Sequence, residues 1–350
     1  MKFTLNDIAK ATSGRIIAGS KDAINRVPTE MDGISIDTRK LSKGNLFVAI
    51  KGAHFDGHDY ILDAVSKGAG ALVVKKGCCR DAINRVPTIK VKDTERALGD
   101  IAAWWRSQID IPRVAITGSN GKSTTKEMAA EIAGNLGCVL KTEGNFNNLI
   151  GLPLTIFRME KSHNVAILEM GMNAPGEIRR LTEIANPDVG LITNATAAHL
   201  EKLHTVESVA NSKGELFASM RSDAIAVING EDLLVRELGR KRSGRKIVFG
   251  MQNNFDVRFL HMDTNGFDSM DLKIAVLGKE YNFKLPVTGA HNVMNAMAAI
   301  SVGVALGVGP SEAVEKLASF HPMSMRMERV QLANGVCVIN DSYNANPESV

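Results

Sequence analysis

The chain has 350 residues, which is too long for one ordinary hydrophobic core and predicts two or three domains. Hydrophobic residues make up 44% of it and charged residues 23%, as in a water-soluble globular protein, and no apolar run is long enough to cross a bilayer. A net charge of +4 without a basic tract and an aromatic content of 5% argue against a nucleic-acid-binding surface. The cysteines are scattered and the N-terminus lacks a secretory signal, so we expect reduced thiols in a cytoplasmic protein.

Residues 1–110 are predicted to form a small α/β domain. Short apolar runs bounded by glycine and lysine are typical of buried strands, and they occur at 46–50 and 71–74. The helical spacing of apolar residues predicts helices over 61–67 and 94–107. The sequence Asp110-Ile111-Pro112 ends the second helix, and we place the domain boundary there.

From Arg113 the pattern changes to alternating strand and helix, which predicts a parallel sheet covered on both faces. Buried strands are predicted over 113–117, 165–170, 189–193, 224–229 and 246–249. A helix through Met128, Ile132 and Leu136 follows the first strand. Later segments predict antiparallel strands over 257–260, 272–277 and 281–285, a hairpin turn at Gly278-Lys279 and a helix over 292–305.

The predicted fold class is therefore α/β, and we place the central domain at 111–327. We expect this domain to be built on a parallel sheet with an antiparallel subsheet. A new strand at 336–340 begins a further unit, 328–350, which the chain does not complete. We therefore expect a C-terminal domain that is mostly missing.

The sharpest chemical signal is Thr-Gly-Ser-Asn-Gly-Lys-Ser-Thr at 117–124, between a predicted buried strand and a helix. A tight glycine turn lets backbone N–H groups surround phosphate oxygens, and the helix N-terminus adds positive potential. We expect Lys122 to reach the β- and γ-phosphates and the Ser123 hydroxyl to bind Mg²⁺. Ile116 stands where the standard pattern has its leading glycine. The alternative is a purely structural glycine turn, which the coincidence of strand, turn, Lys-Ser pair and helix disfavours.

Three further residues are candidates for the site. Glu169 ends a predicted strand, and a carboxylate at the carboxyl end of a parallel strand beside a phosphate loop is where Mg²⁺ is held. Without the loop, the same glutamate would be an ordinary solvated side chain. His199 follows another predicted strand, although a single histidine is more often packed or exposed than a metal ligand. Lys213 by composition alone would be a solvated helix lysine.

Motifs along nearly the whole chain match one family. They are the loop at 116–126, Thr-Glu-Gly-Asn-Phe-Asn-Asn-Leu-Ile-Gly-Leu-Pro at 142–153, Glu-Met-Gly-Met-Asn at 169–173, Gly-Glu-Ile at 176–178, Asp-Ser-Tyr-Asn-Ala-Asn-Pro at 341–347, and the N-terminal segments 37–39, 47–49 and 55–59. With these motifs the chain resembles the Mur ligases, and in particular the branch that adds D-alanyl-D-alanine. The resemblance implies that the central domain is a P-loop ATPase domain and that the C-terminal domain is Rossmann-like.

The resemblance also implies roles for individual residues. The catalytic residues would be Lys122, Glu169, His199 and Lys213, and the Mg²⁺ ligands would be Ser123, Glu169, His199 and Lys213. Lys213 would be carbamylated by CO2, which turns a cation into an anionic ligand. ATP would be bound by Gly118, Ser119, Asn120, Gly121, Lys122, Ser123, Thr124, Asn295, Arg326 and Asp341. The UDP-linked substrate would be bound by Asp37, Thr38, Arg39, Asn145, Asn147 and Asn148. Met325 stands where the family has glycine.

The function implied by the resemblance is an ATP-dependent amide ligase of peptidoglycan precursor synthesis. It would add D-alanyl-D-alanine to UDP-MurNAc-tripeptide through an acyl phosphate, with ATP, two Mg²⁺ ions and the Lys213 carbamate. We expect a cytoplasmic monomer that neither binds nucleic acid nor inserts into membranes. One alternative is another Mur-type, folylpolyglutamate-type or cyanophycin-type ligase. An alternative of a different class is a non-catalytic P-loop nucleotide-binding module.

Overall fold

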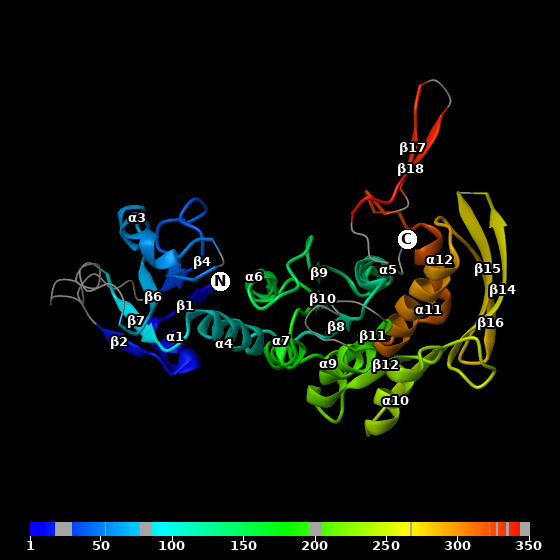
Figure 1. Cartoon of the computed structure of the whole chain (residues 1–350), viewed down its shortest axis with the longest axis horizontal. Coiled ribbons are helices and arrows are strands. Elements are labelled where there is room, and N and C mark those ends of the chain that lie inside the picture. The colour runs from blue at the N-terminus through cyan, green and yellow to red at the C-terminus, as the bar shows by residue number, and fades with distance from the viewer. Residues whose placement is uncertain are drawn as a thin grey trace. The chain divides into compact units, whose positions relative to one another are not determined.

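The structure is a computed structural model that describes all residues except 18–29, 53, 78–85, 197–204, 267, 322, 327, 334–335 and 344–350. The chain forms two compact units (Figure 1). The first contains Met1–Asp110 together with Leu149–Glu160, and the second contains Ile111–Asn148 together with Lys161–Val350.

The first unit is built around a five-stranded sheet. Its strands, in spatial order, are β2 (Arg15–Ile17), β7 (Thr88–Val91), β6 (Ala71–Lys75), β5 (Leu46–Val48) and β4 (Ile34–Ser35). The sheet is parallel except for β2, which runs antiparallel to β7. The short strands β1 (Lys2–Phe3) and β3 (Met31–Asp32) pair separately. The helices are α1 (Leu5–Thr12), the 3-10 turn η1 (Gly57–Tyr60), α3 (Ile61–Ser66), α4 (Thr94–Ser107) and α6 (Gly151–Phe157).

Helix α4 has the bounds that the sequence predicts. It begins after Asp93, whose carboxylate accepts a hydrogen bond of 3.0 Å from the backbone N–H of Arg96. An N-cap of this kind satisfies a backbone donor that would otherwise lack a partner at the helix start. Leu98 and Ile101 are fully buried and join the core of the first unit.

Helix α6 belongs to the first unit, although we predicted one continuous central domain over 111–327. The indole Nε1 of Trp105 in α4 donates a hydrogen bond of 3.0 Å to the carbonyl of Met159, just after α6. Leu152 and Ile156 of α6 are fully buried. The segment 149–160 therefore leaves the second unit to bury its apolar side chains in the first, and nothing in its local pattern distinguishes the two cores.

The second unit is built around a nine-stranded sheet with the order β16-β15-β14-β13-β12-β11-β8-β10-β9. The strands are β8 (Arg113–Thr117), β9 (Val139–Lys141), β10 (Val165–Glu169), β11 (Val189–Ile192), β12 (Ile225–Asn229), β13 (Lys246–Gly250), β14 (Val257–Asn265), β15 (Ser269–Val276) and β16 (Lys279–Leu285). The strands from β9 to β14 are parallel, and β15 and β16 continue the sheet antiparallel, as the sequence predicts. A separate hairpin pairs β17 (Glu328–Gln331) with β18 (Cys337–Asn340).

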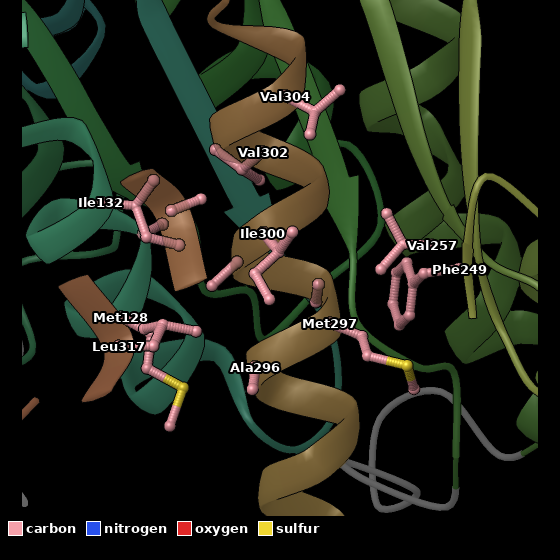
Figure 2. Close-up of a cluster of buried hydrophobic side chains, with 14 of the residues drawn as sticks. Met128, Ile132, Phe249, Val257, Ala296, Met297, Ile300, Val302, Val304 and Leu317 are labelled. Atoms are coloured by element: carbon pink, nitrogen blue, oxygen red, sulfur yellow. The ribbon is translucent and has the colours of Figure 1, made fainter. Parts of the chain in front are cut away.

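Two groups of helices cover this sheet. One group contains α5 (Lys122–Ala133), α11 (Ala290–Ala305) and α12 (Pro310–Ala318), which contact one another; a 3-10 turn, η2 (Gly134–Leu136), extends α5. The other contains α7 (Glu177–Ala185), α9 (Val206–Ser219) and α10 (Leu233–Lys241). Helix α11 is apolar on nearly every side, so it is buried between its neighbours, as Figure 2 shows for Met297, Ile300 and Val302.

The hairpin turn between β15 and β16 differs from the prediction by one residue. Lys279 is already paired with Val276 across the ladder, so the two turn residues are Leu277 and Gly278 and not Gly278 and Lys279. Both have positive φ, +49° for Leu277 and +84° for Gly278, as a type I′ turn requires. Leucine adopts this conformation only at an energetic cost, which explains why the sequence did not reveal it.

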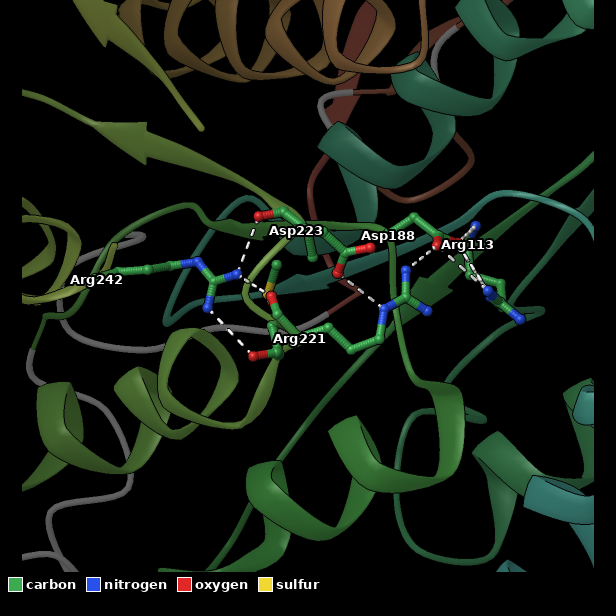
Figure 3. A network of polar contacts seen from close by, with 7 residues as sticks. Arg113, Asp188, Arg221, Asp223 and Arg242 are labelled. Atoms are coloured by element: carbon green, nitrogen blue, oxygen red, sulfur yellow. Dashed lines mark hydrogen bonds and ion pairs between the residues drawn. The ribbon is translucent and has the colours of Figure 1, made fainter. Parts of the chain in front are cut away.

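A polar network lies at the amino ends of the parallel strands, at the edge of the sheet away from the phosphate loop (Figure 3). Asp188 precedes β11 and accepts hydrogen bonds from the backbone and the guanidinium of Arg113 and, at 2.6 Å, from Arg221. Arg242 donates to the carbonyls of Phe217 at 2.7 Å and of Ala224 at 2.9 Å. The Phe217 carbonyl is at the end of α9 and the Ala224 carbonyl lies just before β12, so Arg242 ties the end of that helix to the start of the strand. Within the described parts of the chain, no helix has both the length and the apolar character that a membrane span needs.

Candidate active site

The loop between β8 and α5 can be formed only with glycine at two positions. Gly118 has a φ of +152° and Gly121 a φ of +79°, both on the side of the backbone map that favours glycine. A Cβ atom at Gly118 would lie 1.9 Å from Thr193 Oγ1, and one at Gly121 would lie 2.3 Å from Asn295 Oδ1. The loop therefore packs so closely against Thr193 and Asn295 that neither glycine position has room for a side chain.

Polar residues that follow β11 fix the same loop from the side. The Ser119 N–H donates to the Asn194 carbonyl at 3.0 Å, and the Asn120 N–H donates to Asn194 Oδ1 at 2.8 Å. Thr193 Oγ1 donates to the Asn120 carbonyl at 2.6 Å. Asn229, at the end of β12, in turn holds the Thr193 carbonyl at 2.7 Å. The loop is thus held rigidly before any ligand binds.

Lys122 is the first residue of α5, and its side chain turns back over the loop. Its Nζ donates to the carbonyls of Gly118 at 2.8 Å and of Ser119 at 2.9 Å. Burial lowers the pKa of Lys122, the negative charge of Glu169 opposes that shift, and the positive charge of Arg326 adds to it. The ammonium group is therefore incompletely neutralised and is placed to pair with an anion above the loop.

Glu169 ends β10 and is almost completely buried, with an exposed fraction of 2%. Asn147 Nδ2 donates to its Oε1 at 2.8 Å, and its backbone N–H donates to the hydroxyl of Thr142 at 3.0 Å. Its other carboxylate oxygen, Oε2, is buried without a hydrogen-bond partner among the residues that the structure describes. Burying a carboxylate oxygen without a partner costs free energy unless a cation binds to it. A carboxylate oxygen is the kind of ligand that a hard metal ion such as Mg²⁺ prefers.

Lys213 lies on α9 with an exposed fraction of 2%. Its Nζ makes no hydrogen bond or ion pair with any residue in the described parts of the chain. Burial, with a contribution from the positive charge of Lys122, lowers the pKa of Lys213 to about 7. Near neutral pH a large fraction of this amine is therefore uncharged, unlike that of an exposed lysine.

Arg326 reaches the phosphate loop from the segment that precedes β17. Its Nη2 donates to Ser123 Oγ at 3.1 Å, and its guanidinium lies 4.2 Å from the ring centroid of Tyr343. Met325 has a φ of +59°, the left-handed conformation in which glycine is unstrained. A methionine thus occupies a backbone conformation that favours glycine.

Asn295 on α11 links that helix to α5. Its Oδ1 accepts a hydrogen bond of 3.2 Å from Thr125 Oγ1, and its Nδ2 donates to Asn292 Oδ1 at 3.1 Å. Because the same side chain packs against Gly121, it supports the phosphate loop in addition to facing the cavity.

These residues line one cavity of about 1160 Å³, large enough for a nucleotide and part of a second substrate. The predicted site residues that it brings together are Gly118, Ser119, Asn120, Gly121, Lys122, Ser123, Thr124, Asn145, Asn147, Asn148, Glu169, Lys213, Asn295, Arg326 and Asp341. His199 lies outside the described residues. We did not predict three further residues that line this cavity, Thr193, Asn194 and Asn229. They stand at the carboxyl ends of parallel strands, as Glu169 does, so the same signal could have identified them.

Asp37, Thr38 and Arg39 lie in the first unit, between β4 and β5. The Asp37 carboxylate accepts hydrogen bonds from the Arg39 side chain at 2.8 and 2.9 Å and from its N–H, and these bonds lower the pKa of Asp37 to about 2. Thr38 is buried, and its carbonyl accepts from Lys67 Nζ at 3.2 Å. The turn is therefore ordered, with the Arg39 guanidinium exposed to solvent.

His58, in the 55–59 motif, is a structural residue in this unit. The Lys75 N–H donates to its Nε2 at 3.0 Å, which assigns the ring hydrogen to Nδ1, 2.6 Å from Asp56 Oδ1. The ring thereby joins η1 to the end of β6.

No three His, Cys, Asp or Glu side chains converge on a common point within the described residues. A metal at this site would depend on Glu169, the Ser123 hydroxyl and the oxygens of a bound phosphate. Mg²⁺ in proteins usually binds to one or two carboxylates, and oxygens of phosphate and water complete its coordination shell.

Comparison with known proteins agrees with this geometry. Residues 30–106 match the family model described as Mur ligase family, catalytic domain, and residues 116–303 match the Mur ligase middle domain. The chain belongs to the Mur ligase family, a family of enzymes that form amide bonds.

Among its relatives is the UDP-N-acetylmuramoyl-tripeptide–D-alanyl-D-alanine ligase of Bacillus subtilis strain 168, which is 34% identical over all of this chain and 74% of its own length. Among solved structures, MurF from Acinetobacter baumannii matches with a TM-score of 0.90 at 29% identity, over 100% of this chain and 75% of that one. MurF ligase from Thermotoga maritima in complex with ADP matches with a TM-score of 0.81 at 29% identity, over 91% of this chain and 73% of that one.

Proposed function

We propose that this chain is an ATP-dependent ligase that adds D-alanyl-D-alanine to UDP-MurNAc-tripeptide through an acyl phosphate. The names of its relatives support this choice of substrates over those of other ligases. The observation that carries the proposal is the convergence of Lys122, Glu169 and Lys213 in one cavity behind a glycine-rich phosphate loop. A non-catalytic nucleotide-binding module has no need of a buried carboxylate oxygen without a partner or of a buried lysine whose pKa is lowered to about 7.

The chemistry required of the protein is mainly electrostatic. The γ-phosphoryl group of ATP passes to the terminal carboxylate of the tripeptide, the amine of D-alanyl-D-alanine attacks the acyl carbon, and phosphate leaves. A triphosphate and a carboxylate repel each other, so cationic groups must bring them together. Lys122 and Arg326 supply two such charges at the loop, and the fixed loop amides hold the phosphates in line.

The residues present fit Mg²⁺. We propose that the Ser123 hydroxyl and the free Oε2 of Glu169 hold it, with His199 and a modified Lys213 serving a second ion. When bound, Mg²⁺ would neutralise phosphate charge and polarise the transferred group. The ADP in the Thermotoga maritima relative supports the use of adenine nucleotides, and we propose that Asn295 and Asp341 contact the nucleoside.

We propose that Lys213 is carbamylated. The Lys213 ammonium would first lose a proton, and the neutral amine would then attack the carbon of CO2, forming an N–C bond and releasing a second proton, so that an anionic carbamate results. The burial of Lys213 and its pKa of about 7 support this step, because only the neutral amine is nucleophilic. Lys213 lines the cavity, where the added carboxylate would lie.

We propose that two separate sets of residues bind the tripeptide substrate. Asn145, Asn147 and Asn148 would position its reacting end, because they lie beside Glu169 in the cavity. Asp37, Thr38 and Arg39 would hold the UDP end, for which the exposed guanidinium of Arg39 is a suitable diphosphate partner.

The deciding experiment is a turnover assay with ATP, Mg²⁺, UDP-MurNAc-tripeptide and D-alanyl-D-alanine, followed by mass spectrometry of the UDP-linked product. We expect UDP-MurNAc-pentapeptide and a matching amount of ADP, and no product after Lys122→Ala. Lys241→Ala, which removes an exposed lysine from α10, is the matched control and should retain full activity. Parallel assays with shorter UDP-linked peptides, or with folate and glutamate, test the other ligases. Nucleotide binding without turnover of any acceptor would favour the binding module.

A further inference from the structure

One buried cation near the site takes no part in the chemistry proposed above. Lys126 follows Lys122 by one helical turn on α5, has an exposed fraction of 1%, and does not line the cavity. We infer that Lys126 is a positioning residue that fixes the metal-binding carboxylate of Glu169 through Thr142. The inference rests on the proposed function, because it takes Glu169 to be a metal ligand.

The first step of the connection runs from α5 to the end of β9. Lys126 Nζ donates a hydrogen bond of 2.7 Å to the carbonyl of Thr142 and lies 2.9 Å from Glu127 Oε1. Thr142 is fully buried, and its own N–H donates to the carbonyl of Ile167 in β10 at 3.1 Å. The carbonyl and the N–H of Thr142 are therefore both fixed, one by the phosphate helix and one by the strand that carries Glu169.

The second step runs from Thr142 to Glu169. The Thr142 hydroxyl accepts the backbone N–H of Glu169 at 3.0 Å. Five residues further along the chain, Asn147 donates its Nδ2 to Glu169 Oε1 at 2.8 Å, and its carbonyl accepts the N–H of Gly171 at 2.8 Å. Glu169 is thus held at its backbone and at one carboxylate oxygen by a loop whose start is fixed by Lys126, and only Oε2 is left for a cation.

The choice of lysine at position 126 has a physical reason. A buried ammonium is costly, but Glu127 neutralises it and the Thr142 carbonyl completes its hydrogen bonding. Burial raises the pKa of Glu127, but hydrogen bonds from Lys141 and Lys126 outweigh this effect and hold that pKa below its usual value. Lys141 shares this carboxylate but has an exposed fraction of 41%, and none of its side-chain contacts within the described residues involves Thr142. It is therefore a matched control that removes the same charge from the same glutamate.

The test measures metal binding directly. Mn²⁺ is titrated into the whole chain in the presence of a non-hydrolysable ATP analogue, and free Mn²⁺ is followed by electron paramagnetic resonance. Residues that orient metal ligands typically contribute about 10- to 100-fold in metal affinity, so we expect Lys126→Met and Thr142→Val each to weaken Mn²⁺ binding by at least about tenfold. Lys141→Met should change it by less than about twofold. The affinity for the analogue without metal should stay within about twofold in all variants, because none of these side chains faces the phosphates.

The double variant separates positioning from general loss of stability. Because Lys126 and Thr142 act in one chain of contacts, Lys126→Met with Thr142→Val should weaken Mn²⁺ binding little more than the larger single change. If Lys126→Met does not fold, as judged by circular dichroism, Thr142→Val carries the test alone. Unchanged Mn²⁺ affinity in Thr142→Val, or in folded Lys126→Met, overturns the inference. A wild-type chain that binds no metal–nucleotide complex contradicts the proposed function, whereas tight wild-type binding with unaffected variants contradicts this inference only.

Discussion

The guanidinium of Arg326 donates a hydrogen bond of 3.1 Å to the hydroxyl of Ser123, although 203 positions separate the two residues in the chain. A cationic side chain therefore contacts the hydroxyl that we propose as a Mg²⁺ ligand. A Mg²⁺ ion on that oxygen would repel a guanidinium so close to it, so we expect Arg326 to leave Ser123 when the metal binds. The guanidinium then becomes available to the phosphate oxygens, with which it pairs more strongly than with a hydroxyl.

Arg326→Ala should weaken the binding of Mg²⁺–ATP by at least about tenfold, because charge-assisted hydrogen bonds contribute about 1.5–3 kcal/mol each. Isothermal titration with a non-hydrolysable analogue measures the effect. Arg329→Ala is the control, since Arg329 pairs with Asp268 and does not line the cavity. Equal affinities in the two variants would argue that Arg326 has no part in nucleotide binding.

Gly118→Ala should abolish nucleotide binding and lower the free energy of unfolding by about 1–3 kcal/mol, because the new methyl group would overlap Thr193 Oγ1. Gly134→Ala is the matched control: Gly134 has helical φ, and no atom lies within 4 Å of its added Cβ. That substitution should be neutral or stabilise by about 0.5 kcal/mol. Urea denaturation and nucleotide titration of both variants check the prediction, which fails if Gly118→Ala binds as wild type does.

Lys213 should make stability rise with pH above neutrality. Its pKa is about 7 in the folded chain and 10.5 in the unfolded one, so between these values the unfolded state binds more protons. The free energy of unfolding of the wild type, relative to Lys213→Met, should therefore increase by about 1 kcal/mol per pH unit from pH 7 to 9. Below pH 7 the difference should be constant. Lys241→Met, which removes an exposed lysine, should show no such slope.

Activity at limiting CO2 should rise with pH over the same range in the wild type, because the neutral amine of Lys213 is the form that reacts. Lys213→Ala should lose turnover, and formate or acetate should restore part of it by supplying a carboxylate in the vacated space. Retention of full turnover by Lys213→Ala would remove the basis for the carbamate.

Glu169→Gln should keep the fold and lose metal-dependent activity. Glutamine preserves an oxygen for Asn147 and removes a buried charge, so stability should be unchanged or higher by up to about 1 kcal/mol. Turnover should fall at least about 100-fold, because the proposed Mg²⁺ loses its carboxylate. Thermal unfolding and the turnover assay together test this. A variant that is both unstable and inactive would indicate a structural role instead.

Leu277→Asn should stabilise the hairpin between β15 and β16 by about 1 kcal/mol, because asparagine adopts positive φ more readily than leucine and Asn-Gly is favoured in type I′ turns. Leu277 is 58% exposed, so little apolar burial is lost. Lys279→Asn, two positions on and within β16, should give no gain. Urea midpoints of the two variants measure the difference, and equal midpoints would show that Leu277 is not strained.

Local sequence signals located most elements of the sheet. β8 and α4 have the bounds predicted for them, because a run of apolar residues between polar ends and a capped amphipathic helix are both short-range patterns. The membership of α6 in the first unit could not be predicted, since an apolar helix face does not specify which core it joins. The turn at Leu277 was misplaced by one residue because its conformation goes against the preference of leucine.

The phosphate loop could be located from sequence because its residues are contiguous. The packing of Asn295 against Gly121 and the contact of Arg326 with Ser123 could not, since they join parts of the chain far apart in sequence. The lowered pKa of Lys213 is likewise a property of its burial, and burial depends on how α9 packs and not on the residues beside it.

Residues 149–160 belong to the first unit although they follow part of the second unit in the chain, and this order has a consequence for folding during biosynthesis. The polypeptide passes between the two units at 110–111, 148–149 and 160–161. Domains usually begin to fold in N-terminal order as they leave the ribosome. Here the first unit lacks α6 until translation has gone well past its own boundary, so the indole of Trp105 emerges long before the Met159 carbonyl that it binds. A fragment that stops at residue 110 would leave that surface uncovered and should aggregate, whereas one that extends through residue 160 supplies the missing helix.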